Sequence, residues 1–270
     1  MLVRALAPHA EKHLGVAVKI ENVLGAGGKI GLTKLWKSKP DGYTIATTGV
    51  SIAPLHEFLY GGEFKSKDFT FIFAWSAVNP VLVVNPDKFK TLEEFIKAGK
   101  IAPLSAGVPG RGTASHLAGV LAAEGLGIKV NWVPFSGGSE ALTALAGKHI
   151  DFSVSFAPAA LSLIRAGRIK PLMILSSVPD TGFPDLPIPT QLGYKVPTLP
   201  ELRGIIGPPE IPAQITRILE MSFAKAIKEP DYVDWANKNM VDIAPVFSDD
   251  FRKAAQEGAD LVKKYVNFLK

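Results

Sequence analysis

Apolar residues along the chain follow two spacings, one typical of helices and one typical of strands. The first residues predict an amphipathic helix, because apolar side chains recur three or four residues apart at Leu2, Ala5, Leu6, Ala10 and Leu14. The same spacing predicts further helices at 30–36, 91–99, 113–121, 138–147, 159–166, 212–227, 231–239 and 248–270. Short β-branched or aromatic runs predict strands at 16–23, 44–49, 69–73, 81–84, 104–108, 130–135, 151–156 and 172–176. This alternation indicates an α/β architecture with largely parallel sheets.

Two local signals sharpen this pattern. Thr91 with Glu94 three residues later forms a capping box, and Thr113 is well placed to cap the helix that follows it. In contrast, the proline-rich stretch 179–212 has little periodicity, so we interpret it as a crossing or hinge segment.

A glycine-rich turn at 22–31 separates the first predicted strand from a helix. Four glycines fall within seven residues, and bare backbone N–H groups at a helix N-terminus suit an anion. The dinucleotide fingerprint fails because Ile30 stands where its third glycine is required, and no Gly-Lys-Ser/Thr follows for a phosphate loop. Glycines that only permit tight helix–sheet packing remain an equal alternative.

Two further strand-to-helix turns, 109–117 and 135–141, combine glycine with hydroxyl residues, and a strand ends in the hydroxyl cluster 47–51. Hydroxyl groups and helix N-termini can hold a carboxylate without a buried Lys or Arg. The sequence therefore favours binding without chemistry.

Candidate catalytic residues are weak. No G-x-S-x-G elbow is present, His116 is expected inside a helix, and Asp151 is interpreted as a turn or capping residue. His9 and His13 stand four residues apart and could share a metal ion, but without a third ligand nearby a solvated helix face is favoured. We predict no catalytic residue, no metal and no cofactor.

Composition narrows the class of protein. The 270 residues are 47% hydrophobic, enough for one large or two medium domains, and there is no cysteine for thiol chemistry or disulfides. A net charge of +5 is spread evenly, which argues against nucleic-acid binding and suits small anionic ligands. No apolar run is long enough for direct membrane insertion, and the N-terminus does not read as a signal peptide.

Several motifs occur together in a familiar order: 21–31, Pro40-Asp-Gly-Tyr-Thr44, 109–117, 135–141, Gly147-Lys-His-Ile-Asp151, Arg165-Ala-Gly-Arg168 and Gly204-Ile-Ile-Gly-Pro-Pro209. With them the chain resembles the Bug family, the extracytoplasmic solute receptors of tripartite tricarboxylate transporters. The resemblance implies a periplasmic-binding-protein type II-like fold, with two α/β lobes and a ligand cleft between them. It also implies a monomer that captures a small organic carboxylate and delivers it to the membrane components of such a transporter.

Carried over motif by motif, the resemblance implies ten ligand-binding residues: Thr48, Ser51, Gly112, Thr113, Ser115, Phe135, Gly137, Gly138, Ser155 and Phe156. The first lobe would comprise 1–101 with 206–270, and the second 102–205. Against the family pattern, the chain lacks the signal peptide, the first strand and the first loop. We therefore expect a truncated product or a degenerate receptor, with a periplasmic location implied by resemblance alone. A signalling protein of this fold is one alternative, and an enzyme that uses the cleft is a less favoured one.

Overall fold

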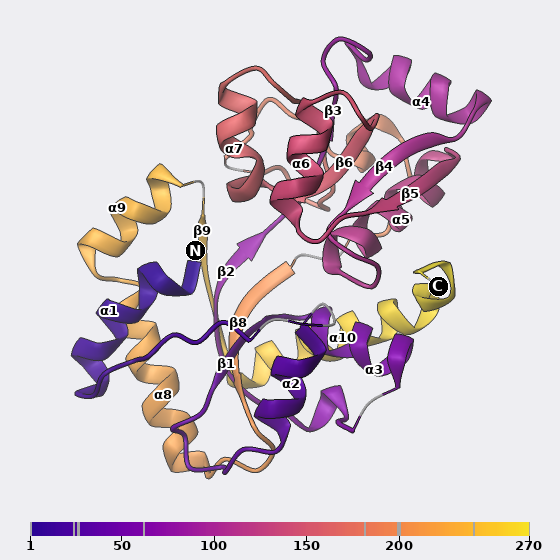
Figure 1. Cartoon of the computed structure of the whole chain (residues 1–270). Coiled ribbons are helices and arrows are strands. Elements are labelled where there is room, and N and C mark those ends of the chain that lie inside the picture. Colours follow the sequence, from indigo (N-terminus) through magenta and orange to yellow (C-terminus); the bar gives the residue numbers. More distant parts are fainter. Residues whose placement is uncertain are drawn as a thin grey trace. The chain divides into compact units, whose positions relative to one another are not determined.

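The computed structural model describes residues 2–23, 25, 28–61, 63–180, 182–198, 201–239 and 241–269. It divides into two compact units, Met1–Ala77 with Glu201–Val266 and Val78–Pro200 with Asn267–Lys270 (Figure 1). The sequence-based boundary at 101 lies too far along the chain, because β3 (Pro80–Val84) and α4 (Leu92–Ile101) pack within the second unit. The second crossing likewise precedes Glu201 and not residue 206, since β8 (Glu201–Gly207) lies in the first unit.

The first unit is built on a four-stranded sheet of order β1-β8-β2-β9. Besides β8 its strands are β1 (Ala46–Gly49), β2 (Thr70–Val78) and β9 (Asp242–Phe247). β8 and β9 are absent from the sequence-based prediction, whereas the strand predicted at 16–23 does not form in its described residues. Strand pairing over long sequence distances decides these cases, and local alternation does not report it.

Six helices of the described chain pack around this sheet: α1 (Leu2–Leu14), α2 (Lys29–Trp36), α3 (Ile52–Tyr60), α8 (Ala213–Ala226), α9 (Pro230–Lys238) and α10 (Ser248–Tyr265). Their core includes Leu6, Phe73, Trp75, Phe223 and Tyr232. The first helix follows the predicted spacing, so the positions that recur three or four residues apart are those that face this core.

His9 and His13 do not form a solvated face, which corrects the interpretation from sequence. His9 packs edge-on against Tyr232 with ring centroids 6.0 Å apart, and His13 Nε2 lies 2.9 Å from Glu229 Oε1. Both histidines therefore join α1 to α9. Within the described residues, no group of three His, Cys, Asp or Glu side chains is placed to hold a metal ion.

The second unit contains a five-stranded sheet of order β5-β4-β6-β3-β7. Its strands besides β3 are β4 (Leu104–Val108), β5 (Val130–Pro134), β6 (Phe152–Phe156) and β7 (Lys170–Ile174). β4 runs parallel to β5 and β6, but β3 is antiparallel to β6 and β7. The prediction of largely parallel sheets is therefore wrong: the strand that enters from the first crossing runs against its neighbours.

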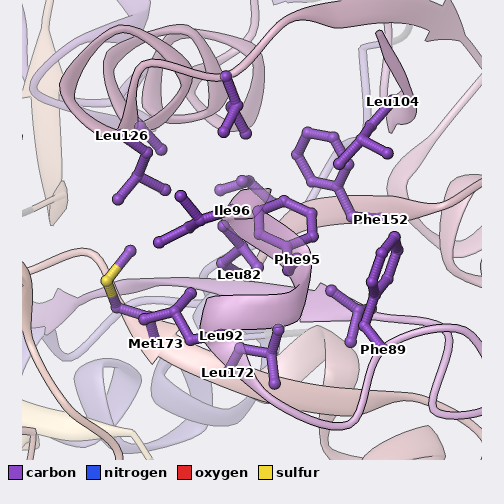
Figure 2. Packing of buried hydrophobic residues seen from close by; sticks show 14 of the residues in the cluster. Leu82, Phe89, Leu92, Phe95, Ile96, Leu104, Leu126, Phe152, Leu172 and Met173 are labelled. Carbon is purple, nitrogen blue, oxygen red and sulfur yellow. The ribbon is translucent and has the colours of Figure 1, made fainter. Parts of the chain in front are cut away.

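In the described part of the second unit, four helices cover the sheet: α4, α5 (Ala114–Leu126), α6 (Gly138–Ala146) and α7 (Ala157–Arg165). Figure 2 shows the core beneath α4 and α5, where Phe95 stacks edge-on with Phe89 and Phe152 at centroid distances of 5.4 and 5.0 Å. Short 3₁₀ turns lie at Ser66–Asp68, Pro189–Leu192 and Val266–Leu269. No helix in the described ranges is both long and apolar enough to cross a membrane.

Candidate functional site

In the second unit, the parallel strands bring their carboxyl ends to one edge of the sheet. Val108 at the end of β4 is in register with Pro134 at the end of β5, and the Phe135 N–H donates to the Val108 carbonyl at 2.9 Å. Gly107 is in register with Ser153 on β6, so Ser155 and Phe156 lie at the same edge. Loops that carry ligand contacts commonly follow this edge in α/β sheets.

Thr113 caps the N-terminus of α5, as predicted from the sequence. Thr113 Oγ1 accepts from the His116 N–H at 3.3 Å, and Gly110 and Gly112 supply the positive φ values, 86° and 70°, that turn the chain before the cap. Gly112 N–H donates to His116 Nδ1 at 3.3 Å, so this N–H is already engaged. Within the described contacts, the N–H groups of Ala114 and Ser115 remain as first-turn donors without a protein acceptor.

His116 supports the loop and is neutral near pH 7. Its side chain is 1% exposed and packs edge-on against Trp132 at 4.9 Å. Burial, with a smaller contribution from nearby Arg111, lowers the pKa of His116 to about 4. The neutral ring thus presents Nδ1 as an acceptor to the Gly112 N–H.

The loop after β5 lies beside this helix N-terminus. The Phe135 ring packs against the backbone of Gly107, and Gly138 at the start of α6 approaches Pro109. Ser136 donates through both its N–H and its hydroxyl to Glu140, which joins the loop to the first turn of α6. The structure therefore gathers the predicted residues of 109–115 and 135–138 at one edge of the second sheet.

In the first unit, Thr48 and Ser51 are both buried, and their hydroxyl groups already donate within the protein. Thr48 Oγ1 donates to the Gly49 carbonyl at 3.1 Å, and Ser51 Oγ donates to Glu201 Oε2 at 2.9 Å. The partner Glu201 had no signal in the sequence, because it lies in the stretch interpreted as a crossing. Burial raises the pKa of the Glu201 carboxyl, opposed by Arg203 and by the hydrogen bond from Ser51.

The glycine-rich turn that precedes α2 is described only in part. Leu24, Ala26 and Gly27 lie outside the described residues, while Gly28 stands at the N-cap of α2 with φ of 110°. A left-handed residue at this cap agrees with glycine as a conformational requirement of the turn.

Two α/β units joined by two crossings of the chain define a fold of the periplasmic-binding-protein class. Solved structures agree over nearly the whole chain: the periplasmic binding protein BugD has a TM-score of 0.86 at 24% identity, covering 97% of this chain and 91% of that one. MatC from Rhodopseudomonas palustris with bound malate has a TM-score of 0.85 at 22% identity, covering 100% and 93%. Rpa4515 from R. palustris with adipate has a TM-score of 0.88 at 22% identity, covering 99% and 91%.

The sequence narrows this class to one family. The model of the TctC family, described as the tripartite tricarboxylate transporter family receptor, matches residues 2–269, and the chain belongs to this family. A UPF0065 protein from the gbd 5′ region of Cupriavidus necator is 30% identical over 267 residues, 97% of this chain and 79% of the relative. The protein BugT of Bordetella pertussis is 32% identical over 201 residues, 72% of this chain and 61% of the relative. The resemblance to the Bug family is thereby confirmed, and the proteins of this family are periplasmic solute-binding receptors.

Proposed function

We propose that this protein is an extracytoplasmic solute-binding receptor that captures a small organic carboxylate and delivers it to the membrane components of a tripartite tricarboxylate transporter. The observation that carries the proposal is the N-terminus of α5, where two backbone N–H groups lack a protein acceptor among the described contacts at the positive end of a helix. Family membership supports the same conclusion.

A dicarboxylate is the ligand class that we favour, because the solved relatives with malate and adipate share this fold. The N–H groups of Ala114 and Ser115 would hold one carboxylate, while Gly112 contributes the conformation of the loop and not its N–H. The remaining contacts are proposed at Thr48, Ser51, Thr113, Phe135, Gly137, Gly138, Ser155 and Phe156. Binding would stabilise whichever arrangement of the units lets the ligand contact both, by a shift of population and without catalysis.

Catalysis in place of binding is less favoured. His116 is neutral and engaged by the Gly112 N–H, and Asp151 accepts from the Ser105 backbone and hydroxyl and from Lys88. Both residues that sequence analysis considered as bases therefore have supporting contacts that account for their presence. A signalling receptor of the same fold would bind ligand equally, and loss of carboxylate uptake in cells that lack this protein distinguishes transport from signalling.

Gly137 allows a sharp test of the carboxylate site. It is the N-cap of α6 with an extended φ of −172°, and an added side chain meets nothing within 4 Å. Asp and Asn are both good N-caps, so Gly137→Asp and Gly137→Asn should fold equally well. Only the aspartate would repel a bound carboxylate, and we expect it to weaken binding about 10-fold or more relative to asparagine.

The measurement is a thermal-shift screen followed by calorimetry with malate, adipate and related acids. A ligand present at 100 times its dissociation constant stabilises the folded protein by about 2.7 kcal/mol, which is a measurable rise in Tm. If no carboxylate raises the Tm, or if the Asp and Asn variants bind equally, the proposed site is wrong.

A further inference from the structure

The second sheet has another surface of interest at the edge opposite the proposed carboxylate site. β6 begins there at Phe152 and ends about 13 Å away at Phe156, one of the predicted ligand residues. Val84 at the end of β3 is in register both with Phe152 and with Lys170 at the start of β7. Three turns of the chain meet at this edge: 85–90, 147–151 and 165–170. The last two hold sequence motifs to which the ligand site gives no role.

Side-chain contacts join these turns into one surface. Lys148 forms an ion pair with Asp87, which ties the turn before β6 to the turn after β3. Lys170 Nζ donates to the Lys90 carbonyl at 2.6 Å, which ties the start of β7 to the same turn. We call the surface that the three turns form the basic edge.

Charge at the basic edge is unbalanced. Its cations are Lys88, Lys90, Lys148, Arg165, Arg168 and Lys170, and its carboxylates are Asp87 and Asp151. The formal net charge of the three turns is therefore +4, against +5 for the whole chain. The helix that follows the first turn adds no net charge, because Glu93 and Glu94 are offset by Lys97 and Lys100. Cations that are spread along the sequence thus gather in space.

Four of these cations are exposed and have no carboxylate partner among the described contacts: Lys90, Arg165, Arg168 and Lys170. Lys90 and Lys170 each donate to a backbone carbonyl, which uses one of the three ammonium donors and leaves the charge uncompensated. Glu94 accepts from the backbone N–H of Lys90. Around the two arginines, the chain from 152 to 178 contains no acidic residue at all.

The backbone at Lys148 gives a second reason to look for a function here. Its φ is 65°, a left-handed conformation that is unfavourable for a residue with a side chain and that glycine would adopt without strain. The lysine nevertheless occupies the turn and places its ammonium group at the surface. Local strain of this kind is typical of positions kept for binding.

The chemistry of the basic edge suits carboxylates of a protein better than a lipid surface. The large apolar residues of the three turns, Phe89, Ile150 and Ile169, are all buried, so the edge offers no apolar group to lipid chains. Arg165 and Arg168 carry planar guanidinium groups, which pair with carboxylates through two parallel hydrogen bonds.

We infer that the basic edge docks an acidic extracytoplasmic segment of the membrane component to which the receptor delivers its ligand. This inference rests on the proposed function and names the surface and the charge that delivery uses. The docking surface and the carboxylate site lie at opposite ends of β6, so a partner on the basic edge leaves the carboxyl ends of the strands uncovered. Charge complementarity of this kind guides encounter and fixes the orientation of a partner.

The test reverses the charge of the edge and measures ligand binding and uptake separately. Arg165→Glu, Arg168→Glu and Lys170→Glu are combined in one variant, and the same three positions are changed to Gln in another. Calorimetry with malate and with adipate should give a Kd within about 2-fold of wild type, because the site is more than a Debye length away. Uptake of the labelled acid by cells that carry the reversed variant in place of wild type should fall about 10-fold or more, with the Gln variant between the two.

A matched control reverses three exposed cations on α10 of the first unit: Arg252→Glu, Lys253→Glu and Lys263→Glu. Both reversed variants should keep the melting temperature of wild type within a few degrees, since all six side chains are exposed. The control should also support wild-type uptake. A change of Asp or Glu to Lys in the membrane component should restore uptake with the variant reversed at the basic edge, and with that variant alone.

The outcomes separate this inference from the proposed function. If malate or adipate binds and the reversed edge supports normal uptake, the inference is wrong and the receptor function stands. If uptake falls only because the Kd rises, the edge acts on ligand binding and the inference is again wrong. If wild type binds phosphatidylglycerol vesicles through this edge and no change in the membrane component restores uptake, the occupant is lipid. If no carboxylate binds wild type, the proposed function itself fails.

Discussion

Protonation of His116 should weaken the folded state, because it would place a charged imidazolium in a buried position near Arg111. In the folded protein its pKa is about 4, against about 6.5 for an unperturbed histidine. Between these two values the unfolded chain binds more protons than the folded chain, so the free energy of unfolding rises with pH there. The contribution of His116 is fully present above about pH 6.5 and is lost as pH falls toward 4. The shift corresponds to about 3 kcal/mol.

Two substitutions isolate this contribution. His116→Asn keeps an acceptor at the position of Nδ1 for the Gly112 N–H, whereas His116→Phe keeps the ring against Trp132 and removes the acceptor. Neither variant titrates, so both should lose the additional acid sensitivity of the wild type. His149, which is exposed in the same unit, provides the control His149→Asn.

The assay is urea unfolding monitored at a series of pH values, with the wild-type free energy compared with each variant at the same pH. From neutral pH to about pH 4, the free energy of unfolding of the wild type should fall by about 3 kcal/mol relative to that of His116→Asn. A difference that stays constant with pH would show that His116 titrates normally in the folded protein. The buried, neutral role assigned to it would then be wrong.

Other substitutions test the packing that positions the two sites. Phe95→Ala should lower the free energy of unfolding by about 3–5 kcal/mol, because a fully buried ring is removed from the core in Figure 2. Ile101→Ala, at the exposed end of the same helix, should change the free energy of unfolding little. Urea unfolding measures both values. Thr113→Val should cost about 1 kcal/mol in the same assay by removing the cap of α5, whereas Thr113→Ser should retain stability. Gly204→Ala should lower stability by about 1–3 kcal/mol, since the new Cβ would lie 2.2 Å from the Phe251 ring, and a melting temperature equal to wild type would contradict that packing.

Elements with their own local signals could be predicted from the sequence. The first helix, the capped helices after Thr91 and Thr113, and the strands predicted at 104–108 and 130–135 form where the pattern placed them, the last ending one residue earlier at Pro134. Each depends on spacing or on a cap within a few residues. β8 could not be predicted, because its main neighbour β1 lies about 150 residues earlier and the proline-rich run before it hides its alternation. The prediction that β3 runs parallel to its neighbours was wrong for a related reason. A strand that enters from a crossing between the units carries no local signal of its direction relative to β6 and β7.

The two candidate sites differ in the same way. In the second unit, a loop and the helix that it enters are encoded together, so glycine, hydroxyl and capping residues within ten positions already specify the capped turn that we propose as the carboxylate site. In the first unit, the hydroxyl of Ser51 meets Glu201 only because two antiparallel strands bring them together. Gly49 has no function that its own neighbours reveal, and its need for a small residue follows from a carboxyl group 152 positions later. A contact that depends on strand pairing, such as that between Ser51 and Glu201, is therefore visible only in three dimensions.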